Sequence, residues 1–216
     1  EIIKTFGFKN TIMECVFGVM NSNGILKEYV QRFDGEFPVA HLKFSVGNLA
    51  DTRRAQTRSP VDYIIEIKFN NDASVSGYGQ RPPLLNAKTI MHEVIHAEMF
   101  RKLLSMSNTN GSISWNKLNT MLTSNDFPGM LDYYRRYGAV GSSHQQMAQH
   151  YRETIAQALK EFDMNRNSWQ LYMDLAWEGL DKQGVVAWDA LSSAEQLRIR
   201  NVINNYRNNA PKGRCR

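Results

Sequence analysis

The sequence predicts an α+β fold, in which a small sheet is followed by a bundle of helices, and three observations support this. The segments LKFSV (42–46) and VDYIIEIKFN (61–70) alternate polar and apolar positions and contain β-branched and aromatic residues, which is typical of strands. Residues 85–104 are mostly good helix formers, without an internal glycine or proline. Helical patterns then continue to about residue 208.

We expect one domain, because 216 residues are close to ordinary domain size and no linker is long enough to separate two cores. Within this domain we expect a sheet-bearing part at about 1–83, a helical part at about 84–208 and a basic tail at 209–216.

The remaining elements are predicted from their local composition. Residues 11–34 are expected to form one helix or two short ones, with Asn21, Asn23 and Gly24 as an interruption. An arginine-rich loop connects the two strands, and a loop rich in Gly, Pro, Asn and Asp follows the second strand. Further helices are expected near 113–123 and 128–137, over 143–163 and 168–180, and from a capping box at Ser192-x-x-Glu195 to about Asn208.

Composition and charge exclude several classes of protein. A hydrophobic fraction of 42% is enough to build a core, which excludes a disordered chain. No stretch approaches the ~18 uncharged apolar residues that a membrane-spanning helix needs, so no membrane span is expected. The net charge of +5 allows a nucleic-acid partner but does not require one, and the scattered basic residues favour a solvated surface. Cys15 and Cys215 are expected to be a buried thiol and a thiol in a loose tail, not a disulfide.

The motif that points to chemistry is His92-Glu93-Val94-Ile95-His96. On a helix each residue turns about 100°, so the two histidines lie one turn apart on the same face. Two imidazoles at this spacing can bind one Zn²⁺, and Glu93 can reach the metal-bound water as a general base. The motif lies in an expected helix after an edge-like strand, which is the arrangement of the zincins, the zinc-dependent peptidases.

A catalytic zinc needs a third protein ligand and an open fourth position. The extended metzincin motif would require Gly at position 99 and His at 102, where this chain has Met99 and Lys102, so that subclass is excluded. On the expected helix 143–163, His144 shares the apolar stripe, whereas His150 falls on the polar face. His144 is therefore the preferred third ligand.

Other third ligands stay open. His150 is one. Glu153 would be the ligand of a gluzincin, although it lies on the polar face of its helix. Asp132 lies in GMLDYYRRYG (129–138), which loosely resembles the aspzincin signature without its threonine. His41 is interpreted as an ordinary residue at a strand start.

Two further interpretations concern the substrate. Tyr151 shares the apolar stripe with His144 and could donate a hydrogen bond to a developing oxyanion, although a core tyrosine is the commoner explanation. The strand 61–70 could form the rim of the cleft and pair with an extended peptide at a free edge, unless the loop 71–83 covers that edge.

Several segments resemble a known group of proteins. MHEVIHAE (91–98), HQQMAQHY (144–151), LKEFD (159–163) and LAWEGL (175–180) resemble uncharacterised zincin-like domains common in Bacteroidetes-type bacteria. Such domains often stand at the C-terminal end of larger exported or toxin-like proteins. The pattern His-x-x-Met-Ala at 144–148 is also similar to SprT-like proteases, in which a third histidine opens a later helix. The chain has no Cys-x-x-Cys pair, unlike the zinc ribbon of some SprT members.

The resemblance implies a zincin-like fold with its active-site helix at 85–104 and a bacterial zinc metallopeptidase that hydrolyses protein or peptide substrates. Alternatives are a DNA-associated protease of the SprT kind, in which the basic loop 51–58 and the tail hold DNA, and a zincin fold that binds zinc or a partner without turnover. A third is a toxin-type protease kept silent by an inhibitor protein. Secretion, or origin from a larger exported protein, is a further implication of the resemblance.

Overall fold

The sheet forms one side of the molecule. The computed structural model of the protein describes residues 1–22, 24–36, 38–49, 53–73, 77–106, 110–112, 148 and 151–215. In this part of the chain one mixed sheet has the spatial order β1 (Ile2–Lys4), β2 (His41–Val46), β4 (Ile64–Phe69) and β3 (Ala55–Thr57). β1, β2 and β4 are parallel, and β3 runs antiparallel to β4. The two predicted strands are confirmed as β2 and β4, whereas β1 and β3 were not predicted.

The alternation that predicted the strands also determines which face is buried. β4 buries Ile65, Ile67 and Phe69 against the helices, as expected for a strand with one face in the core. In β2, Phe44 lies 4.7 Å from the ring of Phe17 in the first helix, measured between ring centroids. The core therefore begins between the inner face of the sheet and the helices that cover it.

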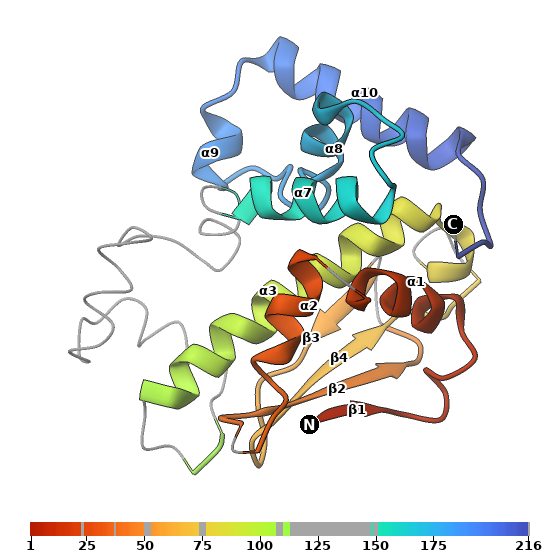
Figure 1. The fold of residues 1–216 in the computed structure, drawn as a ribbon. Helices are drawn as coiled ribbons and strands as arrows, with labels where there is room; N and C mark the ends of the chain where they lie inside the picture. Colours follow the sequence, from red (N-terminus) through yellow and green to blue (C-terminus); the bar gives the residue numbers. More distant parts are fainter. Residues whose placement is uncertain are drawn as a thin grey trace.

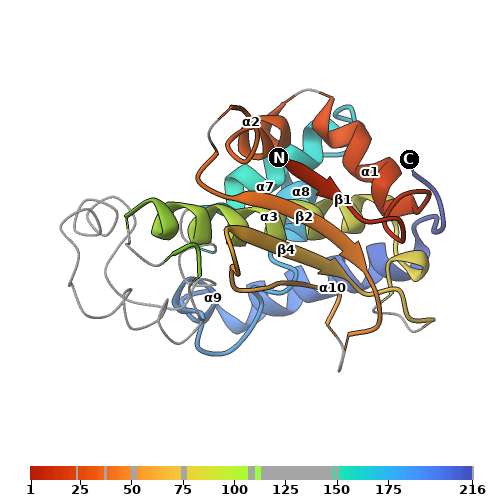
Figure 2. The same ribbon diagram turned by 90° about the horizontal axis from the view of Figure 1, so that it is seen from below.

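The helices next to the sheet are α1 (Ile12–Asn21), α2 (Ile25–Gln31) and α3 (Pro83–Met106). Gly24, with a φ of 81°, separates α1 from α2, so the predicted interruption is confirmed. A short 3₁₀ turn, η1 (Tyr78–Gln80), lies in the predicted loop before α3. α3 extends the predicted helix 85–104 by two residues at each end, and it crosses the molecule between the sheet and the next helix layer (Figures 1 and 2).

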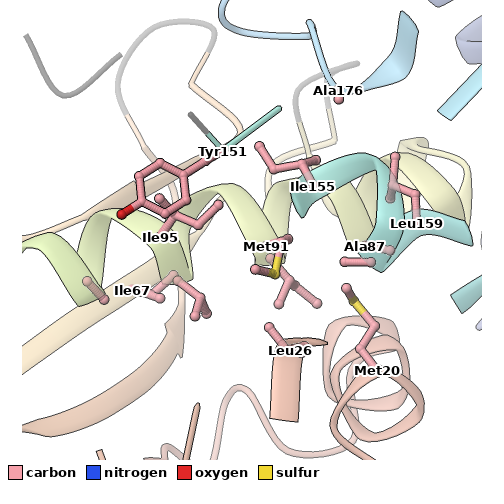
Figure 3. Close-up of a cluster of buried hydrophobic side chains, with 14 of the residues drawn as sticks. Met20, Leu26, Ile67, Ala87, Met91, Ile95, Tyr151, Ile155, Leu159 and Ala176 are labelled. Atoms are coloured by element: carbon pink, nitrogen blue, oxygen red, sulfur yellow. The ribbon is translucent and has the colours of Figure 1, made fainter. Parts of the chain in front are cut away.

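A second helical layer packs on the other side of α3. It contains α7 (Arg152–Phe162), α8 (Trp169–Leu175), α9 (Val186–Asp189) and α10 (Ser193–Asn209). α7 contacts α3, α8 contacts α7, and α10 contacts α8. Figure 3 shows side chains of α7, α1 and α2 around Met91 and Ile95 of α3. Because α3 is covered on several sides, its residues 83–100 are all buried.

These elements confirm an α+β fold with a small sheet and a helical part. The capping box is also confirmed, because Ser192 Oγ accepts a hydrogen bond from the Glu195 backbone at 3.2 Å. The short helix α9 was not predicted. The helices expected near 113–123 and 128–137 lie outside the described residues. In the described part of the chain, no helix is long and apolar enough to cross a membrane.

The expectation of two separate thiols is wrong. Cys15 and Cys215 form a disulfide between α1 and the segment that follows α10, 200 residues apart in sequence. Cys15 is exposed, because α1 turns Met13, Val16 and Phe17 toward the core and places Cys15 on the opposite face. The chain after α10 returns to α1, so the two cysteines meet at the surface (Figure 1).

The expected free edge at strand 61–70 is also wrong. β4 lies between β2 and β3, so both of its edges are hydrogen-bonded to neighbouring strands. The strand begins only at Ile64, because Asp62 and Tyr63 have positive φ values of 49° and 62° and form a turn before it. Among the described residues, β3 is the edge strand on this side of the sheet, and it contacts α3.

Candidate functional site

The two histidines of the motif face each other on α3. His92 and His96 lie one helical turn apart, and their Nε2 atoms are 3.2 Å apart. Both residues are only 6% exposed. Two nitrogens bound to one tetrahedral zinc at ~2.0–2.1 Å are roughly 3.3–3.4 Å apart, so the observed separation fits a shared zinc ion. The same separation also suits a hydrogen bond between the two rings.

Glu93 is held in place by the edge strand β3. Its Oε2 accepts a hydrogen bond from the Thr57 backbone N–H at 2.8 Å and lies 2.7 Å from the Thr57 hydroxyl. The hydroxyl is also 3.0 Å from the backbone carbonyl of Glu93. These contacts couple β3 to the middle of α3 and fix the direction of the carboxylate.

The charge of Glu93 depends on opposing effects. Burial raises the pKa of this carboxyl group, while the hydrogen bonds from Thr57 and the charge of Lys88 act in the opposite direction. A carboxyl whose pKa is raised binds a proton more readily, which suits a group that takes a proton and returns it.

Lys88 lies one turn before His92 on the same face of α3. Its Nζ is 3.3 Å from His92 Nδ1, and it donates a hydrogen bond to the backbone carbonyl of Glu178. Burial lowers the pKa of Lys88 to about 8. Lys88 therefore orients the ring of His92 from the side opposite to Nε2. A ring that binds a metal through Nε2 carries its proton on Nδ1. The amine of Lys88, in its neutral form, can accept a hydrogen bond from this N–H.

Behind Lys88 is a cluster of charges centred on the buried carboxylate of Glu178. Its carboxylate lies 2.7 Å from Arg81, 3.0 Å from Arg207 and 3.5 Å from Arg54. Burial opposes the ionisation of Glu178, but the attraction of the surrounding cations outweighs it and lowers the pKa to about 2. The cluster joins the start of α3, the segment before β3, the turn after α8 and the end of α10 around the site.

A cavity of about 370 Å³ opens beside His92 and Glu93. Gly179 contributes to its wall with a φ of 84°, a conformation that glycine adopts without strain. A Cβ at this position would lie 3.5 Å from Lys88 Nζ, so the chain passes close over the site. The lining residues are Arg53, Arg54, Ala55, Lys88, Thr89, His92, Glu93, Gly179 and Lys182.

The structure does not bring a third metal ligand to the histidine pair among the residues it describes. Glu153, one of the candidates, is exposed on α7. His144, His150 and Asp132 lie outside the described residues, so their roles stay predictions.

Tyr151 is buried, and its ring lies beside Ile95 in the hydrophobic cluster between α3 and α7 (Figure 3). It is not among the described residues that line the cavity. This position favours the interpretation as a core tyrosine. Ala148 and Ile155 are buried with it and Glu153 is exposed, so the predicted apolar stripe is confirmed where the helix is described.

Several residues of the site were not found from the sequence. Lys88 could have been found, because it stands four residues before His92 and therefore on the same helix face. Thr57 lies in a strand of three residues, which is too short to show an alternating pattern. Glu178 and Arg81 reach the site only through the packing of the later helices.

Comparisons with known proteins found no match: no family model, no curated protein and no solved structure matches this chain. The function is therefore inferred from the residues of the site.

Proposed function

We propose that this chain is a zinc-dependent metallopeptidase with a zincin-like fold. The observation that carries the proposal is the convergence of the two Nε2 atoms, 3.2 Å apart, in a helix that also carries Glu93 beside a cavity. His92 and His96 would hold the metal. His144 is proposed as the third ligand, with His150 and Asp132 as alternatives, and the exposed Glu153 is the least favoured.

Zinc, when bound, would polarise the scissile carbonyl and make water more acidic. Glu93 then has two tasks: its carboxylate accepts a proton from the attacking water, and the same group returns this proton to the leaving amine. Thr57 holds the carboxylate in a fixed direction, because it binds Oε2 through both its backbone N–H and its hydroxyl. Thr57 therefore acts as a positioning residue.

The substrate rim is assigned to β3 instead of strand 61–70. Ala55 of β3 lines the cavity, and Thr57 of the same strand contacts Glu93. In an antiparallel edge strand alternate residues direct their backbone groups away from the neighbouring strand. The Thr57 N–H already donates to Glu93, so an extended peptide would pair with β3 near Ala55 and thus place a bond near Glu93.

The disulfide indicates the kind of compartment in which the protein acts. Disulfides form and persist in oxidising environments such as the periplasm or the outside of the cell. The bond between Cys15 and Cys215 therefore supports an exported protein.

A toxin-type protease with an inhibitor partner stays a prediction. It would be supported by growth arrest on expression that the Glu93→Gln variant abolishes.

The proposal is tested by zinc content and casein hydrolysis measured together. We expect one zinc per chain, loss of zinc in His92→Ala, and retained zinc without hydrolysis in Glu93→Gln, because Glu93 is not a ligand. His144→Ala is expected to lose zinc far more readily than His150→Ala, its matched control on the same predicted helix.

Three outcomes would contradict parts of the proposal. Absence of zinc in the wild-type protein would leave a hydrogen-bonded histidine pair. Bound zinc without any hydrolysis that depends on Glu93 would leave a non-catalytic zinc-binding module. Equal zinc loss in His144→Ala and His150→Ala would overturn the choice of third ligand.

A further inference from the structure

The cavity beside the histidine pair carries an excess of positive charge. Besides Lys88, its described lining residues include three cationic side chains, those of Arg53, Arg54 and Lys182, and one carboxylate, that of Glu93. Arg53 and Lys182 are exposed, whereas Lys88 is only 3% exposed. Positive charges gathered around a partly closed space attract an anion more strongly than the same charges on an open surface.

The charge behind the cavity does not neutralise this excess. Glu178 is the nearby buried carboxylate, but it is shared among Arg81, Arg207 and Arg54. The contact to Arg54 is the longest of the three, at 3.5 Å, against 2.7 Å to Arg81. One carboxylate therefore faces three guanidinium groups in the described part of the chain, and one of the three, that of Arg54, lines the cavity.

The positions of the two arginines are built into the fold. Asn70, which is fully buried after β4, donates from Nδ2 to the backbone carbonyl of Arg53 at 2.8 Å. Its backbone N–H donates to the carbonyl of Arg54 at 2.9 Å. Asn70 therefore fixes the backbone from which both guanidinium groups extend. Cations on a fixed backbone lose less conformational freedom on binding than cations on a mobile loop.

We propose that this cavity binds a carboxylate of the substrate, so that the chain acts on acidic peptides. This inference rests on the proposed peptidase function and names its substrate class. Arg53, Arg54 and Lys182 would bind the carboxylate through charge-assisted hydrogen bonds. The carboxylate is either the side chain of Asp or Glu or the C-terminal group of the peptide.

The size of the cavity favours a peptide over a nucleic acid. Its volume of about 370 Å³ fits one or two side chains. Single-stranded nucleic acids are bound in long basic grooves that follow about 4–16 nucleotides, with aromatic side chains for stacking. No Phe, Tyr or Trp is among the described residues that line this cavity.

The test measures equilibrium binding of short peptides to the full chain after removal of metal with EDTA, so that no hydrolysis occurs. One pair of probes is a capped neutral peptide with a single Glu and its Gln counterpart. The other pair is a neutral peptide with a free C-terminus and its amide. We expect the charged member of at least one pair to bind about ten-fold tighter, and the pair that shows this identifies the source of the carboxylate.

The variants Arg53→Gln and Lys182→Gln are expected to weaken that binding about two- to five-fold each, because both side chains are exposed. Lys27→Gln removes the same charge from the exposed face of α2, away from the residues that line the cavity, and should leave binding unchanged. Circular dichroism checks that all three variants are folded.

Equal binding of charged and neutral peptides would overturn the inference, and so would an equal effect of Lys27→Gln. Tighter, salt-sensitive binding of a single-stranded oligonucleotide that is lost in Arg53→Gln would also overturn it in favour of a nucleic-acid site. Carboxylate binding in a protein that takes up no zinc would support the cavity and contradict the peptidase. Hydrolysis without a preference for acidic peptides would support the peptidase and contradict carboxylate binding in the cavity.

Discussion

The buried carboxylate of Glu178 offers a direct test of how the site is supported. Its side chain is 2% exposed and forms an ion pair with Arg81, which is 1% exposed. Glu178→Gln keeps the shape of the side chain but removes the charge, so Arg81 would stay in the interior without its counter-ion. Arg207 would lose a partner at 3.0 Å at the same time.

The expected loss of stability is large. Breaking a buried ion pair by removing one partner typically costs about 3–5 kcal/mol, because the remaining charge is uncompensated. The lowered pKa of Glu178 gives a second figure, for the free energy by which the ionised carboxylate stabilises the fold. A fall from 4.5 to about 2 corresponds to about 3 kcal/mol of stabilisation at neutral pH.

The pH dependence has a definite sign. The pKa of Glu178 in the folded protein lies below its ordinary value, so the stabilisation is fully present above about pH 4.5 and is lost as the pH falls toward 2. The difference in unfolding free energy between the wild-type protein and Glu178→Gln should therefore be largest near pH 7. It should become smaller by about 3 kcal/mol over the acid range.

Urea unfolding followed by circular dichroism at several pH values measures this difference. The control is Glu195→Gln, which removes an exposed carboxylate from Arg198. Arg198 keeps two hydrogen bonds to Asp174, both of 2.7 Å, so the control should lose much less stability. The reasoning would be refuted if Glu178→Gln unfolds at the same urea concentration as the wild-type protein, or if the difference does not change with pH.

Three further predictions concern other contacts. Replacing Cys15 and Cys215 by serine should lower the unfolding free energy by up to about 5 kcal/mol, because the disulfide closes a loop of nearly the whole chain, and equal urea midpoints with and without reductant would contradict this. Thr57→Val should reduce hydrolysis about ten- to hundred-fold through loss of the hydroxyl contact to Glu93, with Thr57→Ser retaining most activity, and unchanged rates in both variants would remove its positioning role. Tyr151→Phe should keep hydrolysis within about three-fold, because the ring lies in the core, whereas a loss near hundred-fold would restore the oxyanion role.

The His-Glu-x-x-His motif was predictable because the geometry of a helix relates nearby residues directly. Positions 92 and 96 must lie on one face of any helix, and residues 85–104 had strong helical composition. The sequence alone therefore places the histidine pair and Glu93 on one helix. Strands β2 and β4 were predictable for a similar reason, because alternation is a local property.

Contacts between distant segments could not be predicted in this way. The order of strands places β3, not β4, at the edge, and no local pattern encodes that order. The same limit applies to Glu178, which reaches α3 through the packing of α8, and to the bond between Cys15 and Cys215. The contacts of Glu178 and Cys215 depend on how the later helices return to the first half of the chain.

The third ligand illustrates a different limit. The choice of His144 assumed a turn of about 100° per residue along one α-helix. His144 itself lies outside the described residues, so its place on this stripe stays a prediction. The predicted stripe nevertheless holds at Ala148, Tyr151 and Ile155, which are all buried.

The most direct measurement is an anomalous diffraction map at the zinc edge from crystals grown with zinc. A single peak within ~2.0–2.1 Å of the Nε2 atoms of both His92 and His96 would match the proposed site, and a third ligand would be visible in the same map. No peak at the pair, or imidazole rings that turn their Nε2 atoms away from each other, would contradict the assignment of a zinc hydrolase.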